Sequence, residues 1–132
     1  MPITFRIDKK SGVVFTTMEG NVSISEIIDG LKGLMNHPDF SPGFNGLVDM
    51  RNSTVNSTPE EVRRIAELMT GQREKIGMSR SAVVVSKDVI FGMARMFQVF
   101  AEQSSIKTEL FRDINEARQW LGIGERKDDD SP

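Results

Sequence analysis

The sequence predicts an α/β fold: a mixed, mostly parallel five-stranded sheet with an N-terminal β-hairpin and four helices, in the order ββαβαβαβα. Residues 81–86 are a continuous run rich in valine, which is typical of a strand that helices cover on both faces. Helical patterns separate the later strands, which must therefore run parallel, and the turn residues 9–12 join the first two strands as an antiparallel hairpin. The 132 residues fit one domain, expected over residues 1–123, with residues 124–132 as a flexible tail.

The N-terminal part of the chain contains the hairpin and the first helix. Residues 3–8 alternate apolar and polar side chains, as a half-buried strand does, and residues 13–19 form the second strand. A helix begins at Ser23, where Glu26 completes a capping box, because apolar residues then recur at helical spacing as far as Met35.

The remaining part of the chain alternates strands and helices. Residues 47–51 are the third strand, and the second helix begins at Thr58, where a proline follows the cap and Glu61 completes a second capping box. After the strand at residues 81–86 and its helix, a short last strand covers residues 107–111. Asp113 then caps the final helix.

The helix expected at residues 89–101, with Ser86 as its cap, is apolar on nearly all sides. Such a helix needs a second partner besides the sheet. Phe91, Met96 and Val99 lie outside the face that core packing explains, so they are a candidate surface for self-association as a homodimer. The alternative is a small apolar ligand bound between this helix and its neighbour.

Composition excludes several classes of function. The chain has no cysteine for disulfides or thiolate chemistry, and its 17 Lys and Arg against 19 Asp and Glu argue against a nucleic-acid partner. No apolar run approaches the roughly 20 residues of a membrane helix, so we expect a cytoplasmic protein without membrane insertion. The single histidine, His37, lies in a loop, and phosphate-binding and G-x-S-x-G motifs are missing. We therefore expect no metal, no cofactor and no enzymatic activity.

Polar residues at the end of the third strand are a candidate functional site. Asp49 and Arg51 lie at the carboxyl end of a parallel strand, where ligands of open α/β sheets bind, and Asn52 and Ser53 follow them. These four residues form a partner or ligand surface in one interpretation. In the other, Asp49 and Arg51 are a local ion pair.

The hydroxyl-rich residues 52–58 are expected to form a loop before the second helix. A helix N-terminus stabilises a phosphate, so Ser57 and Thr58 are candidate phospho-acceptors. Loop formation and helix capping explain the same residues without a phosphate.

Two segments resemble the SpoIIAA-like proteins, whose fold is shared with STAS domains, the anti-sigma-factor antagonists. The first is LVDMRN at residues 47–52, followed by the hydroxyl-rich segment, and the second is FRDINEARQWLG at residues 111–122. The second segment matches the ending F-x-D-x-x-x-A-x-x-W-L through Phe111, Asp113, Ala117, Trp120 and Leu121. The resemblance covers about residues 3–123 and implies a STAS-like fold.

The resemblance also implies a non-catalytic regulatory or protein-interaction role. Signalling STAS domains carry the phosphorylated serine in a D-S-S-G segment, which Asn56-Ser57-Thr58-Pro59 matches in its two hydroxyls but not in its acidic residue and glycine. Ser57 is the nearest match to the acceptor. Some relatives of the fold are likened to lipid-binding CRAL-TRIO domains, which implies a carrier or sensor of a small apolar or anionic ligand as the alternative function.

Overall fold

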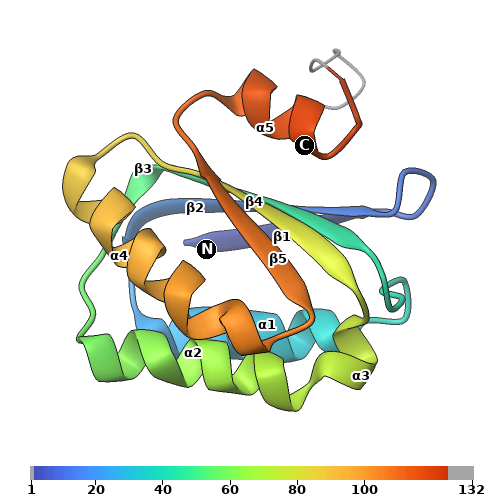
Figure 1. Cartoon of the computed structure of the whole chain (residues 1–132), viewed down its shortest axis with the longest axis horizontal. Helices are drawn as coiled ribbons and strands as arrows, with labels where there is room; N and C mark the ends of the chain where they lie inside the picture. Colours follow the sequence, from blue (N-terminus) through green and yellow to red (C-terminus); the bar gives the residue numbers. More distant parts are fainter. Residues whose placement is uncertain (1, 125–132) are drawn as a thin grey trace.

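A five-stranded sheet with the strand order β1-β2-β3-β4-β5 forms the centre of the computed structural model, which describes residues 2–124. Its strands are β1 (Ile3–Asp8), β2 (Val13–Val22), β3 (Asn45–Val55), β4 (Ser79–Val84) and β5 (Ile106–Phe111). β1 and β2 pair antiparallel, whereas all the other neighbours pair parallel. The predicted α/β class and strand directions are therefore confirmed (Figure 1).

Helices cover both faces of this sheet. They are α1 (Ile24–Met35), α2 (Pro59–Gly71), α3 (Arg73–Ile76), α4 (Asp88–Phe100) and α5 (Ile114–Trp120), with a 3₁₀ turn at Ala101–Gln103. The helices α1, α2 and α4 each connect one parallel strand to the next in the sheet, and crossovers of the same hand place all three on one face. The helix α5 follows the last strand and lies on the other face (Figure 1). The short helix α3 is an addition to the four predicted helices.

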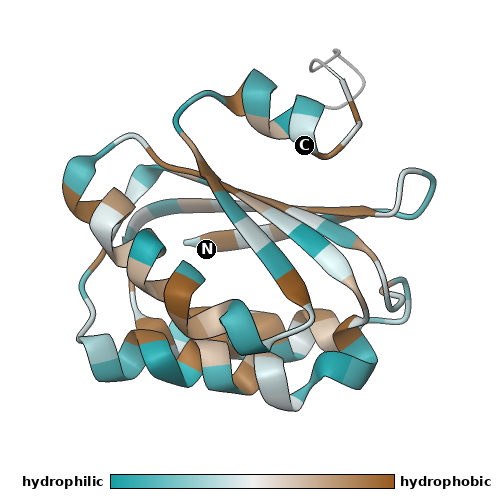
Figure 2. Ribbon diagram, in the orientation of Figure 1, coloured by the Kyte–Doolittle hydropathy of each residue, from teal (hydrophilic) through white to brown (hydrophobic). Residues whose placement is uncertain are grey.

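Two hydrophobic cores result, one on each face. Val83 of β4 and Val85, which follows the strand, belong to the core beneath α1, α2 and α4, whereas Ala82 and Val84 belong to the core beneath α5. The covering of β4 on both faces confirms the interpretation of its apolar sequence. Figure 2 shows hydrophilic residues over the outer side of α2, as expected for a helix with one face on the core.

Side-chain caps begin three of the helices as predicted. Ser23 and Thr58 each form a complete capping box at α1 and α2, and the Asp113 carboxylate accepts from two backbone N–H groups of α5. The prediction for α4 is wrong. Lys87 is its N-cap and provides no side-chain bond, because the Ser86 hydroxyl donates to the Arg51 carbonyl instead (2.9 Å).

The structure also corrects the predicted end of the third strand. β3 continues from Arg51 to Val55, so most of the expected loop at residues 52–58 is strand. The extension pairs with β2 after a register shift opposite residues 17–19, and it buries Ser53 and Val55. Residues 125–132 of the predicted tail lie outside the described residues. Within residues 2–124, no helix is both long and apolar enough to cross a membrane.

Candidate functional site

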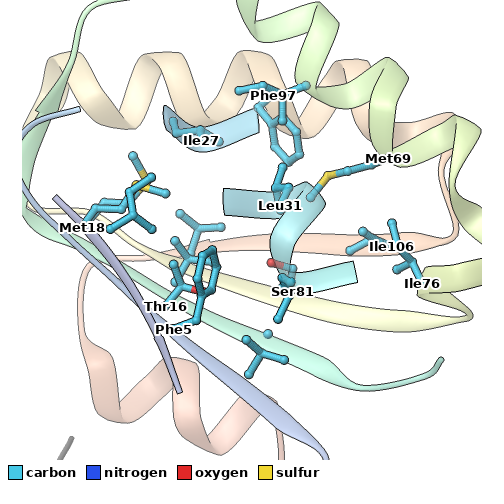
Figure 3. A pocket seen from close by; sticks show the side chains of 18 of the residues that line it. Phe5, Thr16, Met18, Ile27, Leu31, Met69, Ile76, Ser81, Phe97 and Ile106 are labelled. Carbon is cyan, nitrogen blue, oxygen red and sulfur yellow. The ribbon is translucent and has the colours of Figure 1, made fainter. Parts of the chain in front are cut away.

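An apolar cavity of about 190 Å³ lies between the sheet and the helices α1, α2 and α4. Sheet residues that line it include Phe5, Thr16, Met18, Ser81, Val83 and Ile106. Helix residues that line it include Ile27, Leu31, Met69, Met93, Ala94 and Phe97. Figure 3 shows Thr16 and Ser81 on the sheet side of the cavity, with Leu31, Met69 and Phe97 opposite them.

Small residues on the sheet leave this space beneath the helices. Gly46 and Ser81 are register partners on β3 and β4, and a methyl group on Gly46 would lie 3.7 Å from the Ser81 oxygen, an ordinary contact distance. By contrast, α1 approaches the sheet closely at Gly30, where a Cβ would lie 3.0 Å from the Phe5 ring. The helix layer therefore rests on Phe5 and leaves free volume over the smaller residues of β3 and β4.

The volume of the cavity is large enough to matter for both stability and binding. At roughly 24 cal/mol per Å³, an empty space of this size costs about 4 to 5 kcal/mol, which is comparable with the whole stability of a marginal domain. An engineered apolar cavity of roughly 150 Å³ in another protein binds benzene. The cavity can therefore hold a molecule of similar size, and such a molecule would offset part of the cost.

A second group of predicted residues lies at the carboxyl end of β3. The Arg51 guanidinium donates to both Asp49 carboxylate oxygens (2.9 and 2.8 Å), and this hydrogen bonding to Asp49 raises the pKa of Arg51 above its ordinary value. Next to this pair, Arg112 binds Asp88 at 2.8 Å, and its guanidinium lies over the Phe91 ring. The geometry supports the local ion pair, and a partner or ligand surface at these residues stays a prediction.

Ser53 cannot belong to a contact surface. Its side chain is 0% exposed, and its hydroxyl donates to the Met50 carbonyl (3.0 Å). Its own carbonyl accepts from Lys87 Nζ (3.1 Å), which lies at the start of α4. The expected surface of Asp49, Arg51, Asn52 and Ser53 is therefore corrected at Ser53, whereas Asn52 is exposed.

The two candidate phospho-acceptors have different surroundings. The Thr58 oxygen accepts from the Glu61 backbone N–H (3.2 Å) in the cap of α2. The Ser57 hydroxyl is part-buried and donates to the Met93 sulfur at 3.0 Å. Because Met93 lines the apolar cavity, Ser57 connects the loop before α2 to the cavity wall. Sequence reasoning could not find this contact, since 36 residues separate the two side chains.

The three residues predicted for self-association differ in exposure. Val99 is 55% exposed, whereas Phe91 and Met96 are only part-exposed. The Arg112 guanidinium lies 4.6 Å from the centre of the Phe91 ring and covers it. The three residues are therefore not one evenly exposed patch, because Arg112 covers Phe91. Homodimer formation through Phe91, Met96 and Val99 stays a prediction.

The remaining polar groups of the described residues form no cluster of metal-binding side chains. Within residues 2–124, no three His, Asp or Glu side chains lie close enough together to hold a metal ion. His37 is exposed, and its Nδ1 accepts from the Asp39 backbone N–H (3.0 Å), which stabilises the turn after α1.

Comparison with known proteins supports the fold. No protein-family model matches the chain, and no curated protein matches it. Among solved structures, the chain is similar to an uncharacterised protein of the DUF3478 family with a SpoIIAA-like fold from Shewanella loihica PV-4, with a TM-score of 0.58 and 15% identity. The alignment covers 90% of this chain and 91% of that chain. The chain therefore has a SpoIIAA-like fold, as its resemblance to these proteins predicts.

Proposed function

We propose that this domain binds a small apolar molecule without transforming it and acts as a carrier or sensor of that molecule. The observation that carries the proposal is the cavity of about 190 Å³, which is lined almost entirely by apolar side chains beneath α1, α2 and α4. Ala94 and Phe97 place α4 in this lining, which agrees with the alternative that a ligand lies against this helix. Burial of the ligand's apolar surface would supply the binding free energy.

The methionines offer a direct test of this proposal. Five of the eight methionines line the cavity, namely Met18, Met35, Met50, Met69 and Met93. With methyl-labelled methionine, toluene is expected to shift the NMR signals of these five methyl groups and to raise the melting temperature, because it binds the folded state alone. The signals of Met78 and Met96, which do not line the cavity, serve as the internal control. Shifts confined to these two signals would contradict the proposal.

A regulatory interaction through the loop before α2 is a second candidate function. The contact between Ser57 and Met93 favours it, because a ligand that displaces Met93 would also release the Ser57 hydroxyl. A protein partner that binds this loop could then respond to the content of the cavity. Such a response would combine the regulatory role that the SpoIIAA-like resemblance implies with the role of a ligand sensor.

If a kinase acts on this loop, we expect the phosphate on Ser57 and not on Thr58, because the Thr58 oxygen is engaged in the cap of α2. The protein would be incubated with a kinase-containing lysate of its source organism and then mapped by peptide mass spectrometry. Ser57→Ala is expected to abolish the modification, and Thr58→Ser, which keeps a capping hydroxyl, is the matched control. An unmodified Ser57 after incubation would remove the phosphate switch.

A further inference from the structure

A second hollow, of about 650 Å³, lies on the surface between α4 and the edge strand β5. β5 is the last strand of the sheet, so no neighbouring strand within residues 2–124 covers its outer side. Three large hydrophobic side chains of these residues are exposed, and two of them, Met78 (83%) and Val99 (55%), line the hollow. Exposed apolar side chains beside the edge of a sheet are typical of an interaction surface.

Two hydroxyl groups that line the hollow have no partner. The hydroxyl oxygens of Ser105 and Thr108 are buried and form no hydrogen bond within residues 2–124. Thr108 as a whole is only 7% exposed, so bulk water does not satisfy its hydroxyl. Because an unsatisfied buried hydroxyl is unfavourable, a polar group of a molecule bound in the hollow would be stabilised here.

Side chains already occupy part of the outer edge of β5. Gln98 Nε2 donates to the Thr108 carbonyl (2.7 Å), and the Ser104 hydroxyl donates to the Ile106 carbonyl (3.3 Å). The edge therefore does not offer a free row of carbonyl groups to an added strand. A molecule in the hollow would be recognised mainly by side chains.

The helix α4 and the strand β5 run beside each other in opposite directions (Figure 1). Asp88, at the start of α4, binds Arg112, which follows the end of β5 (2.8 Å). Gln98 and Thr108 meet between these two ends, and we call their contact the central hydrogen bond. Residues before this bond on α4 are therefore level with residues after it on β5.

Four charged side chains lie around the central hydrogen bond in an alternating pattern, and all four line the hollow. On the helix side, Arg95 lies one turn before the bond, and Glu102 lies one turn after it. On the strand side, Lys107 lies just before the bond, and Glu109 lies just after it and on the same face as Lys107. None of the four forms an ion pair within residues 2–124.

We propose that a second copy of this chain binds in the hollow, about a two-fold axis that passes through the level of the central hydrogen bond. The two β5 strands then lie antiparallel, because such an axis, perpendicular to the sheet, exchanges the two ends of each element. Lys107 of each copy faces Glu109 of the other, and Arg95 faces Glu102 of the other copy. The result is four pairs of opposite charge and no pair of like charge.

The dissociation constant of this dimer would be measured by sedimentation equilibrium. Lys107→Glu is expected to weaken dimerisation at least about tenfold, because it converts two attractive pairs into two repulsive pairs. Lys107 is exposed, so the substitution leaves the core intact. Combining Lys107→Glu with Glu109→Lys exchanges the two charges and is expected to restore the affinity to within about threefold of the original value.

Lys32→Glu is the matched control for the change in net charge, since Lys32 is exposed on α1 and does not line the hollow. It should change the dissociation constant less than about threefold. Combining Lys107→Glu with Glu102→Lys controls for the orientation and should not restore dimerisation, because Glu102 faces Arg95 of the other copy.

Three results would overturn the inference while the cavity function stands. The first is a protein that stays monomeric at the concentrations used for NMR. The second is a dimer that Lys107→Glu and Lys32→Glu weaken equally. The third is recovery of the dimer with Glu102→Lys in place of Glu109→Lys, which would place β5 of one copy against α4 of the other.

Discussion

Gly77→Ala is expected to lower the free energy of unfolding by at least about 3 kcal/mol. Gly77 connects α3 to β4 with φ of 73° and ψ of −176°, a conformation that L side chains rarely adopt. A Cβ at this position would lie 2.6 Å from the Gly43 nitrogen. That nitrogen cannot move away freely, because it donates to the Ile76 carbonyl at 2.8 Å. Urea denaturation measures the loss.

Gly20→Ala is the matched control for this substitution. Gly20 also has a positive φ of 70°, but a Cβ there would meet nothing within 4 Å. Its replacement should therefore cost only the backbone strain, about 1 to 2 kcal/mol. If both variants lost the same free energy of unfolding, the close contact with residues 42–43 would contribute nothing to the cost of Gly77→Ala. Ile76 lines the cavity, so the hydrogen bond from the Gly43 nitrogen to the Ile76 carbonyl also holds one end of the cavity wall in place.

The parts of the fold that depend on neighbouring residues could be predicted from the sequence. The capping boxes at Ser23 and Thr58 need only residues three positions apart, and the hairpin needs only a short turn between two alternating segments. The parallel direction of β4 also follows from the sequence, because a helix precedes and follows it. These signals decide the element order and therefore the fold class.

The parts that depend on packing between distant segments could not be predicted. The small polar residues after Arg51 indicate a loop, yet pairing with β2 keeps Ser53 and Val55 in β3. Tertiary pairing therefore overrides local propensity at this strand. The extent of the cavity also depends on packing between distant segments. Each apolar residue of its lining is typical of a filled core, and only the spacing between sheet and helices shows that Ser81 and Ala94 face free volume.

Ala94→Leu is expected to weaken toluene binding at least about tenfold without loss of stability. Ala94 is 5% exposed on the inner side of α4 and lines the cavity, so a larger side chain has space to enter. Leucine there would occupy volume that toluene needs and would reduce the cost of the empty space. The measurements are the toluene dissociation constant, from the methionine methyl signals, and the free energy of unfolding in urea.

Ala117→Leu separates cavity filling from a general effect of a larger side chain. Ala117 is 0% exposed in the core beneath α5 and does not line the cavity. Leucine at this filled position should lower the free energy of unfolding by about 1 to 3 kcal/mol while toluene binding is unchanged. If Ala94→Leu were as destabilising as Ala117→Leu, the two faces of the sheet would be packed alike. A loss of toluene binding without a loss of stability at Ala94, and the reverse at Ala117, would therefore distinguish a binding cavity beneath α4 from an ordinary core.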